Sequence, residues 1–165
     1  MKIAIIYSTS TKTTKKACKI LSGKLNADVQ LIPIEMAKTE CLLKYNFIIL
    51  AVSSYNGKVQ SIFKRYISHN IKTLKERPIA LVINCEEDKD RFKDTFSEEL
   101  VNSSYITSNF GYELNADEGN IFEKRKVNKL IQNYEKNGKN LPKINLNEID
   151  KFSDYINDLI EKRVG

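Results

Sequence analysis

Short apolar runs alternate along the chain with segments of helical periodicity. Nearly every residue is apolar in the runs 2–7, 47–52 and 79–83, which is typical of strands buried on both faces. A shorter run over 29–33 ends at Pro33, as suits an edge strand or a strand end. Residues 105–107, before the turn residues 109–111, complete a prediction of five strands.

Apolar residues at helical spacing predict helices after the first, third and fourth strands and at the end of the chain. The cleanest stripe follows the third strand and consists of Val59, Ile62, Phe63, Tyr66 and Ile67. The others are Ala17, Ile20, Leu21 and Leu25, then Phe92, Phe96 and Leu100, and finally Ile149, Phe152, Ile156, Leu159 and Ile160. Residues 137–142 are expected to form a loop.

Strands that alternate with helices predict an α/β fold, with right-handed crossovers and a parallel sheet covered on both faces. Ligands of such sheets bind outside the carboxyl ends of the strands, where the strand order reverses. The loops of interest are therefore Ser8–Thr14, Ser53–Lys58 and Asn84–Asp88, which follow the first, third and fourth strands.

The composition is that of an ordinary globular protein, with 165 residues of which 41% are hydrophobic and 29% charged. This length predicts a single domain over 1–165 with one substantial core. No apolar run approaches the roughly 18 residues that a membrane span needs, and the N-terminus does not resemble a secretory signal. We therefore expect a cytoplasmic protein without a transmembrane segment.

The charge and the cysteines exclude several classes of function. The net charge of +6 is more often diffuse surface charge than a nucleic-acid footprint, and no nucleic-acid motif accompanies it. Cys18, Cys41 and Cys85 lie far apart without a C-x-x-C pair, so neither a disulfide framework nor a metal site is expected. His69 is the only histidine and sits on a predicted helix, so no catalytic residue is assigned.

A basic run, Lys124–Lys126 with Lys129, lies near the C-terminal third of the chain. It could contact an acidic partner or a membrane surface, although such a run is more often a solvated helix face.

The first loop is rich in hydroxyls and lysines and leads into a helix. A helix N-terminus offers unpaired N–H groups and a positive dipole end, which favour an anion. Lys12, Lys15 and Lys16 add positive charge where it costs a few tenths of a kcal/mol each unless an anion is bound. The alternative is that the hydroxyls cap the helix and the lysines are solvated. Neither a Walker pattern nor G-x-G-x-x-G is present.

The sequence Thr9-Ser10-Thr11-Lys12-Thr13-Thr14 resembles the phosphate loop of flavodoxins, [ST]-x-T-G-x-T, which holds the terminal phosphate of FMN. Lys12 stands where that family usually has glycine. The resemblance implies a three-layer flavodoxin-like sandwich with a five-stranded parallel sheet in the order 2-1-3-4-5.

Residues 47–57 with Ser61-Ile62-Phe63, and then residues 77–84, resemble more closely the branch that includes menaquinone-dependent protoporphyrinogen oxidase. Two features depart from that branch. Asn56 occupies the position of an aromatic residue before the loop glycine, and the short acidic segment 86–90 replaces a long basic insertion.

The resemblance implies an FMN site formed by the three loops. Tyr55 would stack on or beside the flavin ring, the backbone of Asn56 and Gly57 would face its N5 atom, and Asn84 and Cys85 would line its pyrimidine end. Glu86, Glu87 and Asp88 would lower the flavin potential by repulsion. The predicted cofactor-binding residues are Thr9, Ser10, Thr11, Lys12, Thr13, Thr14, Ser53, Ser54, Tyr55, Asn56, Gly57, Asn84, Cys85 and Glu86.

Three functional interpretations follow. The first is an FMN-binding redox protein that passes electrons between partner proteins or to a quinone. The second is a quinone-dependent protoporphyrinogen oxidase, which peripheral membrane contact would suit. The third is a flavin-free binding module that kept the fold after Lys12 replaced the glycine.

Overall fold

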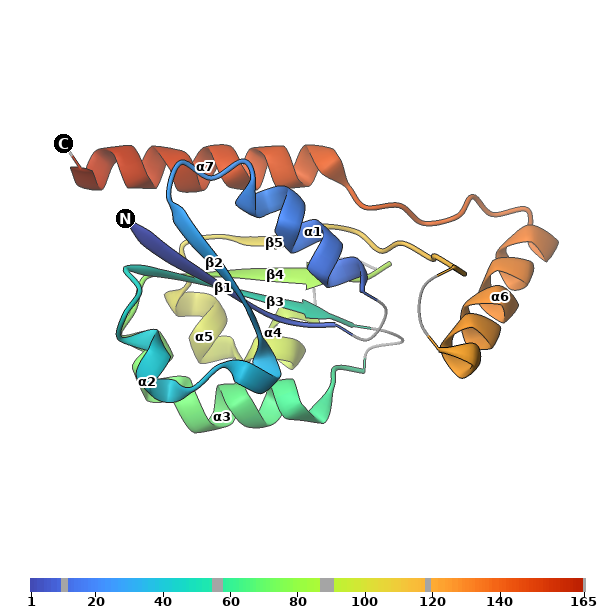
Figure 1. The fold of residues 1–165 in the computed structure, drawn as a ribbon, viewed down its shortest axis with the longest axis horizontal. Coiled ribbons are helices and arrows are strands. Elements are labelled where there is room, and N and C mark those ends of the chain that lie inside the picture. Colours follow the sequence, from blue (N-terminus) through green and yellow to red (C-terminus); the bar gives the residue numbers. More distant parts are fainter. Residues whose placement is uncertain (10–11, 55–57, 87–90, 118–119, 165) are drawn as a thin grey trace.

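Five parallel strands form a single twisted sheet at the centre of the computed structural model, which describes residues 1–9, 12–54, 58–86, 91–117 and 120–164. The strands are β1 (Lys2–Ser8), β2 (Asp28–Pro33), β3 (Phe47–Ser53), β4 (Ile79–Asn84) and β5 (Thr107–Asn109). Their order is β2-β1-β3-β4-β5, and each neighbouring pair is parallel (Figure 1). The predicted fold class and strand order are confirmed.

The strand register brings the carboxyl ends of four strands to one edge of the sheet. Ser8 at the end of β1 pairs with Val52, Ser53 pairs with Asn84, and Asn109 at the end of β5 pairs with Ile83. The loops that leave these strands therefore start side by side, which positions any ligand site at this edge.

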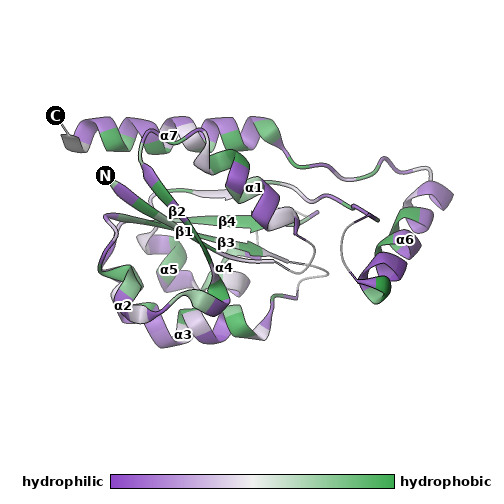
Figure 2. Ribbon diagram, viewed as in Figure 1, coloured by the Kyte–Doolittle hydropathy of each residue, from purple (hydrophilic) through white to green (hydrophobic). Residues whose placement is uncertain are grey.

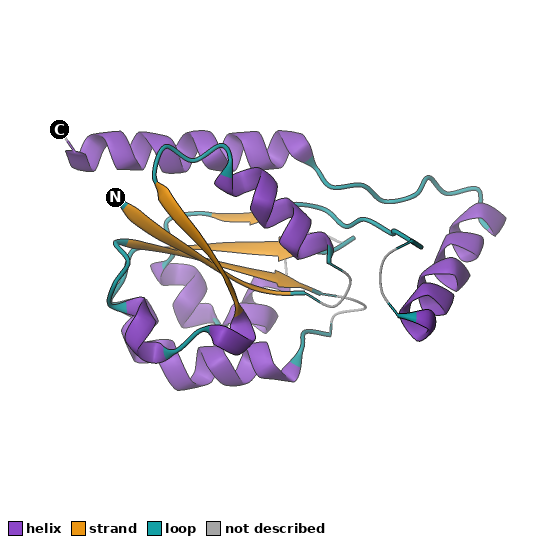
Figure 3. Ribbon diagram, viewed as in Figure 1, coloured by secondary structure: helices purple, strands orange, loops and turns teal. Residues whose placement is uncertain are grey.

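Helices cover both faces of the sheet because successive strand side chains point to opposite sides. Ile3, Ile5 and Tyr7 of β1 pack in one cluster with α1 (Thr13–Ser22) and α7 (Leu146–Val164). Ala4 and Ile6 belong to the opposite cluster, with α3 (Ser61–Lys75), α4 (Arg91–Phe96) and α5 (Glu98–Ser103). Figure 3 shows these two helical layers, and in Figure 2 the central strands are predominantly hydrophobic.

Three helical elements, among them α6 (Ile121–Lys136), and one break were not predicted. The turn η1 (Ile34–Met36) and the short helix α2 (Thr39–Leu42) fill the connection between β2 and β3. The stripe Phe92, Phe96 and Leu100 is buried as expected, but it spans α4 and α5 rather than one helix. Ser97 separates them with φ of 74°, a conformation incompatible with a continuous right-handed helix.

The fifth strand begins two residues later than expected. Tyr105 already donates a backbone hydrogen bond to the Ile79 carbonyl at 2.9 Å, while strand pairing proper starts at Thr107. Phe110, expected in a turn, is fully buried and packs edge-on against Phe152 of α7 with ring centroids 5.2 Å apart. The apolar character of Phe110 therefore serves the core rather than the turn.

Helix α6 (Ile121–Lys136) lies to one side of the layers in Figure 1. It begins with a capping box in which the Asn120 side chain accepts from the Glu123 N–H and the Glu123 carboxylate accepts from the Asn120 N–H. Arg125 and Lys129 of the basic run are exposed on this helix, as a solvated face requires. Within the described part of the chain, no helix has the length and apolar character needed to cross a membrane.

Gly111 occupies a position that only glycine fits. Its φ is 73°, and a Cβ atom there would lie 2.6 Å from the Lys143 carbonyl oxygen and 3.1 Å from the Asn145 nitrogen. This close approach accompanies an isolated antiparallel bridge to Ile144 and a 2.8 Å hydrogen bond from the Asn145 N–H to the Phe110 carbonyl. The segment before α7 is thus held against the end of β5.

We predict that Gly111→Ala lowers the free energy of unfolding by about 3 kcal/mol, because it combines the left-handed backbone penalty with a clash against the main chain. Gly138→Ala is the matched control, since Gly138 also has positive φ (62°) but nothing within 4 Å of a Cβ. That variant should lose only about 1 kcal/mol. Urea unfolding of both variants measures the difference, and equal losses would contradict the packing role.

Candidate functional site

Hydrogen bonds tie the three predicted loops together at the carboxyl edge of the sheet. The Ser54 N–H donates to the Asn84 carbonyl at 3.1 Å, joining the ends of β3 and β4. Gln60, just before α3, accepts from the Ser8 hydroxyl and donates through Nε2 to the Thr9 carbonyl at 3.3 Å. These hydrogen bonds join the ends of β3 and β4 to each other, and the end of β1 to the residue before α3.

Helix α1 begins at this edge of the sheet, and its N-cap residue has a backbone conformation that glycine favours. Lys12 is its N-cap and has φ of 60° and ψ of −8°, in the left-handed region. This is the position where the phosphate loop that the sequence resembles has glycine. Lys12 therefore retains the backbone shape expected of a glycine despite carrying a side chain.

The first turn of α1 leaves positive potential that its own residues do not offset. Its described residues include no acid, and the Lys12 side chain makes no capping hydrogen bond. The first N–H groups of a helix have no partners within the helix, so this end suits an anion.

Four buried polar atoms at this edge have no hydrogen-bond partner among the described residues. They are Thr9 Oγ1, Thr14 Oγ1, Ser54 Oγ and Asn84 Oδ1, and they come from all three loops. Each unsatisfied buried polar atom costs about 1–3 kcal/mol, and such groups are few in native proteins. Their concentration where parallel α/β folds bind ligands fits a cofactor rich in oxygen and nitrogen, as FMN is.

The segment after β5 forms another wall of the candidate site, beside the three loops. Asn84 Nδ2 donates to the Gly111 carbonyl at 3.0 Å, which fixes the amide and leaves its Oδ1 atom as the unpaired acceptor. Asn109 Oδ1 accepts from the Gly111 N–H at 3.0 Å and from the Cys85 N–H at 3.3 Å. The ends of β4 and β5 are thereby locked together.

Glu113 ties this wall to α1. The Thr13 hydroxyl donates to the Glu113 carbonyl at 3.0 Å, and Lys16 Nζ lies 2.7 Å from a Glu113 carboxylate oxygen. Lys16 therefore has a negative partner within the chain, because the Glu113 carboxylate compensates its charge. Lys12 and Lys15 remain exposed near the helix start.

The structure places the described candidate residues as follows. Thr9 follows β1, Lys12 is the N-cap of α1, and Thr13 and Thr14 are buried in the first turn of that helix. Ser53 and Asn84 end their strands, and Ser54 and Cys85 follow them. Glu86 is exposed. Ser10, Thr11, Tyr55, Asn56 and Gly57, together with Glu87 and Asp88, lie outside the described residues.

The Cys85 side chain is buried among protein atoms. It is 4% exposed, and its sulfur accepts a hydrogen bond from Asn109 Nδ2 at 3.3 Å. Cys18, on the buried face of α1, is also enclosed, and burial raises the pKa of its thiol far above the ordinary value. No group of three or more potential metal ligands occurs in the described ranges.

Three residues of this edge escaped the analysis of the sequence: Gln60, Asn109 and Glu113. Glu113 meets Thr13 and Lys16 across about a hundred residues of chain, and no local pattern signals such a contact. Asn109 was expected only in a turn, and no prediction was made for Gln60.

Fold and site together define a parallel α/β protein whose strand ends carry a candidate anion site. Comparison with known families identifies it further: the profile described as "Flavodoxin domain" matches residues 4–140. The chain belongs to this flavodoxin domain family.

Solved flavodoxins share the fold at low sequence identity. Flavodoxin 2 of Bacillus cereus is 18% identical with a TM-score of 0.55, covering 83% of this chain and 99% of its own. Two-electron reduced Megasphaera elsdenii flavodoxin is 14% identical with a TM-score of 0.55, covering 67% and 82%. A flavodoxin from the domain Archaea is 13% identical with a TM-score of 0.56, covering 79% and 93%. No curated protein matches the sequence.

We predict that Lys12→Gly raises the free energy of unfolding by about 1 kcal/mol, because glycine adopts the left-handed conformation without the steric cost of a Cβ atom. Lys12→Ala is the control, since it removes the same charge but keeps the Cβ atom. Chemical denaturation of the three proteins tests this, and a glycine variant no more stable than the alanine variant would contradict it.

Proposed function

We propose that the chain binds FMN at the carboxyl edge of its sheet and serves as an electron-transfer flavoprotein. The observation that carries this proposal is the group of four unpaired buried polar atoms in the three loops. Membership of the flavodoxin domain family and the likeness to solved flavodoxins support the same cofactor class.

Residues of the first loop would bind the phosphate. Thr14 Oγ1 is fully buried in the first turn of α1 and lacks a partner among the described residues, so it can donate to a phosphate oxygen. Lys12 would add charge from the exposed side. Thr9, Thr13 and the candidates Ser10 and Thr11 complete this proposed subsite.

Residues of the other loops would hold the flavin ring. Asn84 presents Oδ1 as an acceptor for a ring N–H, because its Nδ2 already donates to Gly111. Ser53, Ser54, Cys85 and Glu86 would line the remaining edge, with Tyr55, Asn56 and Gly57 against the ring as the resemblance implies.

Bound FMN supplies one- and two-electron transfer, and the chain supplies placement and electrostatics. The exposed carboxylate of Glu86 is the described acidic group of the third loop. Placed near the ring, it would disfavour added negative charge. Redox proteins or a quinone are the proposed partners, and a cytoplasmic location remains our prediction.

A titration with FMN, and with riboflavin as the phosphate-free comparison, tests the proposal. We expect tight FMN binding and much weaker riboflavin binding. In Thr14→Val, FMN affinity should fall on the order of tenfold or more because a charge-assisted hydrogen bond is lost, while riboflavin affinity stays within about twofold. Quenching of flavin fluorescence measures both ligands.

Thr73→Val, a change of the same kind on α3, should leave both affinities unchanged. Thr14→Val should also fold with undiminished stability, since it removes a buried hydroxyl that lacks a partner. Equal, weak binding of FMN and riboflavin by the wild type would refute the phosphate site and favour the flavin-free module.

Protoporphyrinogen oxidation is a more specific hypothesis, and it rests on the resemblance of residues 47–57, 61–63 and 77–84. The family match does not separate this branch from electron carriers, so the activity stays a prediction. A direct assay of protoporphyrinogen oxidation with menaquinone, using the FMN-loaded protein, tests it, and absence of turnover there would leave electron transfer as the function.

A further inference from the structure

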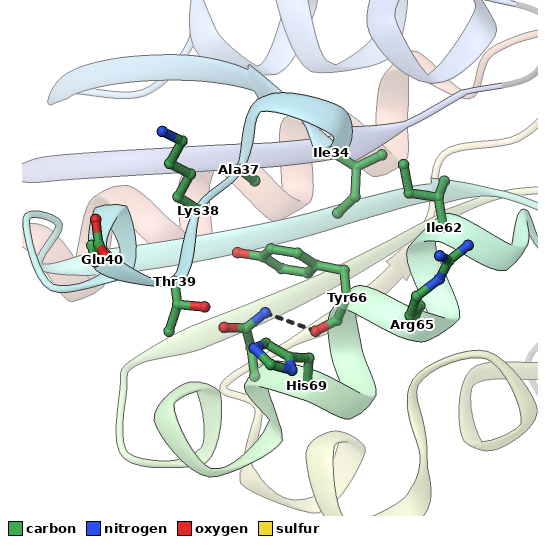
Figure 4. A pocket seen from close by; sticks show the side chains of 10 residues that line it. Ile34, Ala37, Lys38, Thr39, Glu40, Ile62, Arg65, Tyr66 and His69 are labelled. Carbon is green, nitrogen blue, oxygen red and sulfur yellow. Dashed lines mark hydrogen bonds between the residues drawn. The ribbon is translucent and has the colours of Figure 1, made fainter.

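A second cavity lies on the α3 face of the sheet and shares no residue with the candidate FMN site. It has a volume of about 540 Å³ and opens between α3 and the segment 34–40, which contains η1 and the start of α2. Figure 4 shows side chains from both elements around it. We call it the α2–α3 pocket.

The floor of the α2–α3 pocket is apolar. Ile34, Ala37 and Ile62 contribute aliphatic surface, and in Figure 4 the Tyr66 ring lies across the middle, with its hydroxyl directed toward Lys38 and Thr39. A flat apolar body can pack against such a ring and its aliphatic neighbours.

Two buried polar atoms in the pocket lack partners among the described residues: Tyr66 Oη and Asn70 Oδ1. Asn70 is only 2% exposed. Its Nδ2 atom donates to the Tyr66 carbonyl at 2.9 Å, which fixes the amide and leaves Oδ1 unsatisfied. Burial, and secondarily the nearby Cys41, raises the pKa of Tyr66 to about 12, so its hydroxyl keeps its proton and is a donor at neutral pH.

The charged residues that line the pocket favour an anion. Lys38 and Arg65 carry positive charge against the single carboxylate of Glu40, and the His69 imidazole also lines the pocket. In Figure 4 the Arg65 guanidinium lies beside Ile62 at the end of the ring opposite Lys38 and Glu40. The lining thus carries one excess positive charge when His69 is neutral.

We propose that the α2–α3 pocket binds a small aromatic monocarboxylate. The ring of the ligand would lie on Tyr66 and the aliphatic side chains. Its carboxylate would accept from the Tyr66 hydroxyl at the Lys38 end of the pocket, and a polar substituent would donate to Asn70 Oδ1. This inference stands independently of FMN binding, because neither its residues nor its charges belong to that site.

The test uses benzoate, 4-hydroxybenzoate and 2-naphthoate as probes, each with its methyl ester as the uncharged comparison. Binding is followed by amide chemical shifts of the ¹⁵N-labelled full chain, with and without excess FMN. We expect saturable shifts confined to residues 34–40 and 62–70, unchanged by FMN, and at least tenfold tighter binding of at least one acid than of its ester.

Tyr66→Phe should weaken that acid at least fivefold without destabilising the protein, since the lost hydroxyl has no partner among the residues that the structure describes. Tyr155→Phe on α7, at the opposite face of the sheet, is the matched control and should change the affinity less than twofold. Absence of saturable binding by all three acids would overturn the proposal. So would shifts that map to the strand ends, or equal affinity for acid and ester with no effect of Tyr66→Phe.

Discussion

Strand β3 is buried along its whole length from Phe47 to Ser53, and its backbone can satisfy its hydrogen bonds only through the parallel partners β1 and β4. This pairing is the constraint on which the rest of the structure depends. Because a buried backbone group without a partner is costly, the register of the three central strands is fixed. Their carboxyl ends then fall at one level, and every feature of the candidate FMN site follows from that alignment.

The site combines rigid supports with unsatisfied atoms. Gln60, Asn109 and Glu113 hold the surrounding segments by hydrogen bonds. Thr14, Ser54 and other buried groups have polar atoms without partners among the described residues. A chain selected for stability alone would pair or replace such atoms. The unpartnered polar atoms and the left-handed backbone of Lys12 each cost conformational free energy, and a bound ligand can offset that cost.

Much of the fold could be predicted from the sequence because the central strands are continuously apolar and the helices carry clear stripes. The loop positions followed from topology, and Thr14 and Asn84 entered the prediction that way. The break at Ser97 escaped prediction because Phe92, Phe96 and Leu100 keep helical spacing across it. Glu113 and Gln60 could not be assigned to this edge from the sequence because their partners are set by tertiary packing between distant segments, and the ion pair of Lys16 with Glu113 is of the same kind.

The contact between Gly111 and the segment 143–145 has an evolutionary consequence. The chain leaves the sheet after Phe110 and returns to the same place at Asn145. The segment 111–144, which contains α6, is therefore a long loop whose two ends are adjacent. The entropic cost of closing such a loop grows only slowly with its length. Insertions and deletions in α6 can therefore accumulate over evolutionary time while β5 and α7 keep their places, which makes this helix the natural location for divergence among related proteins.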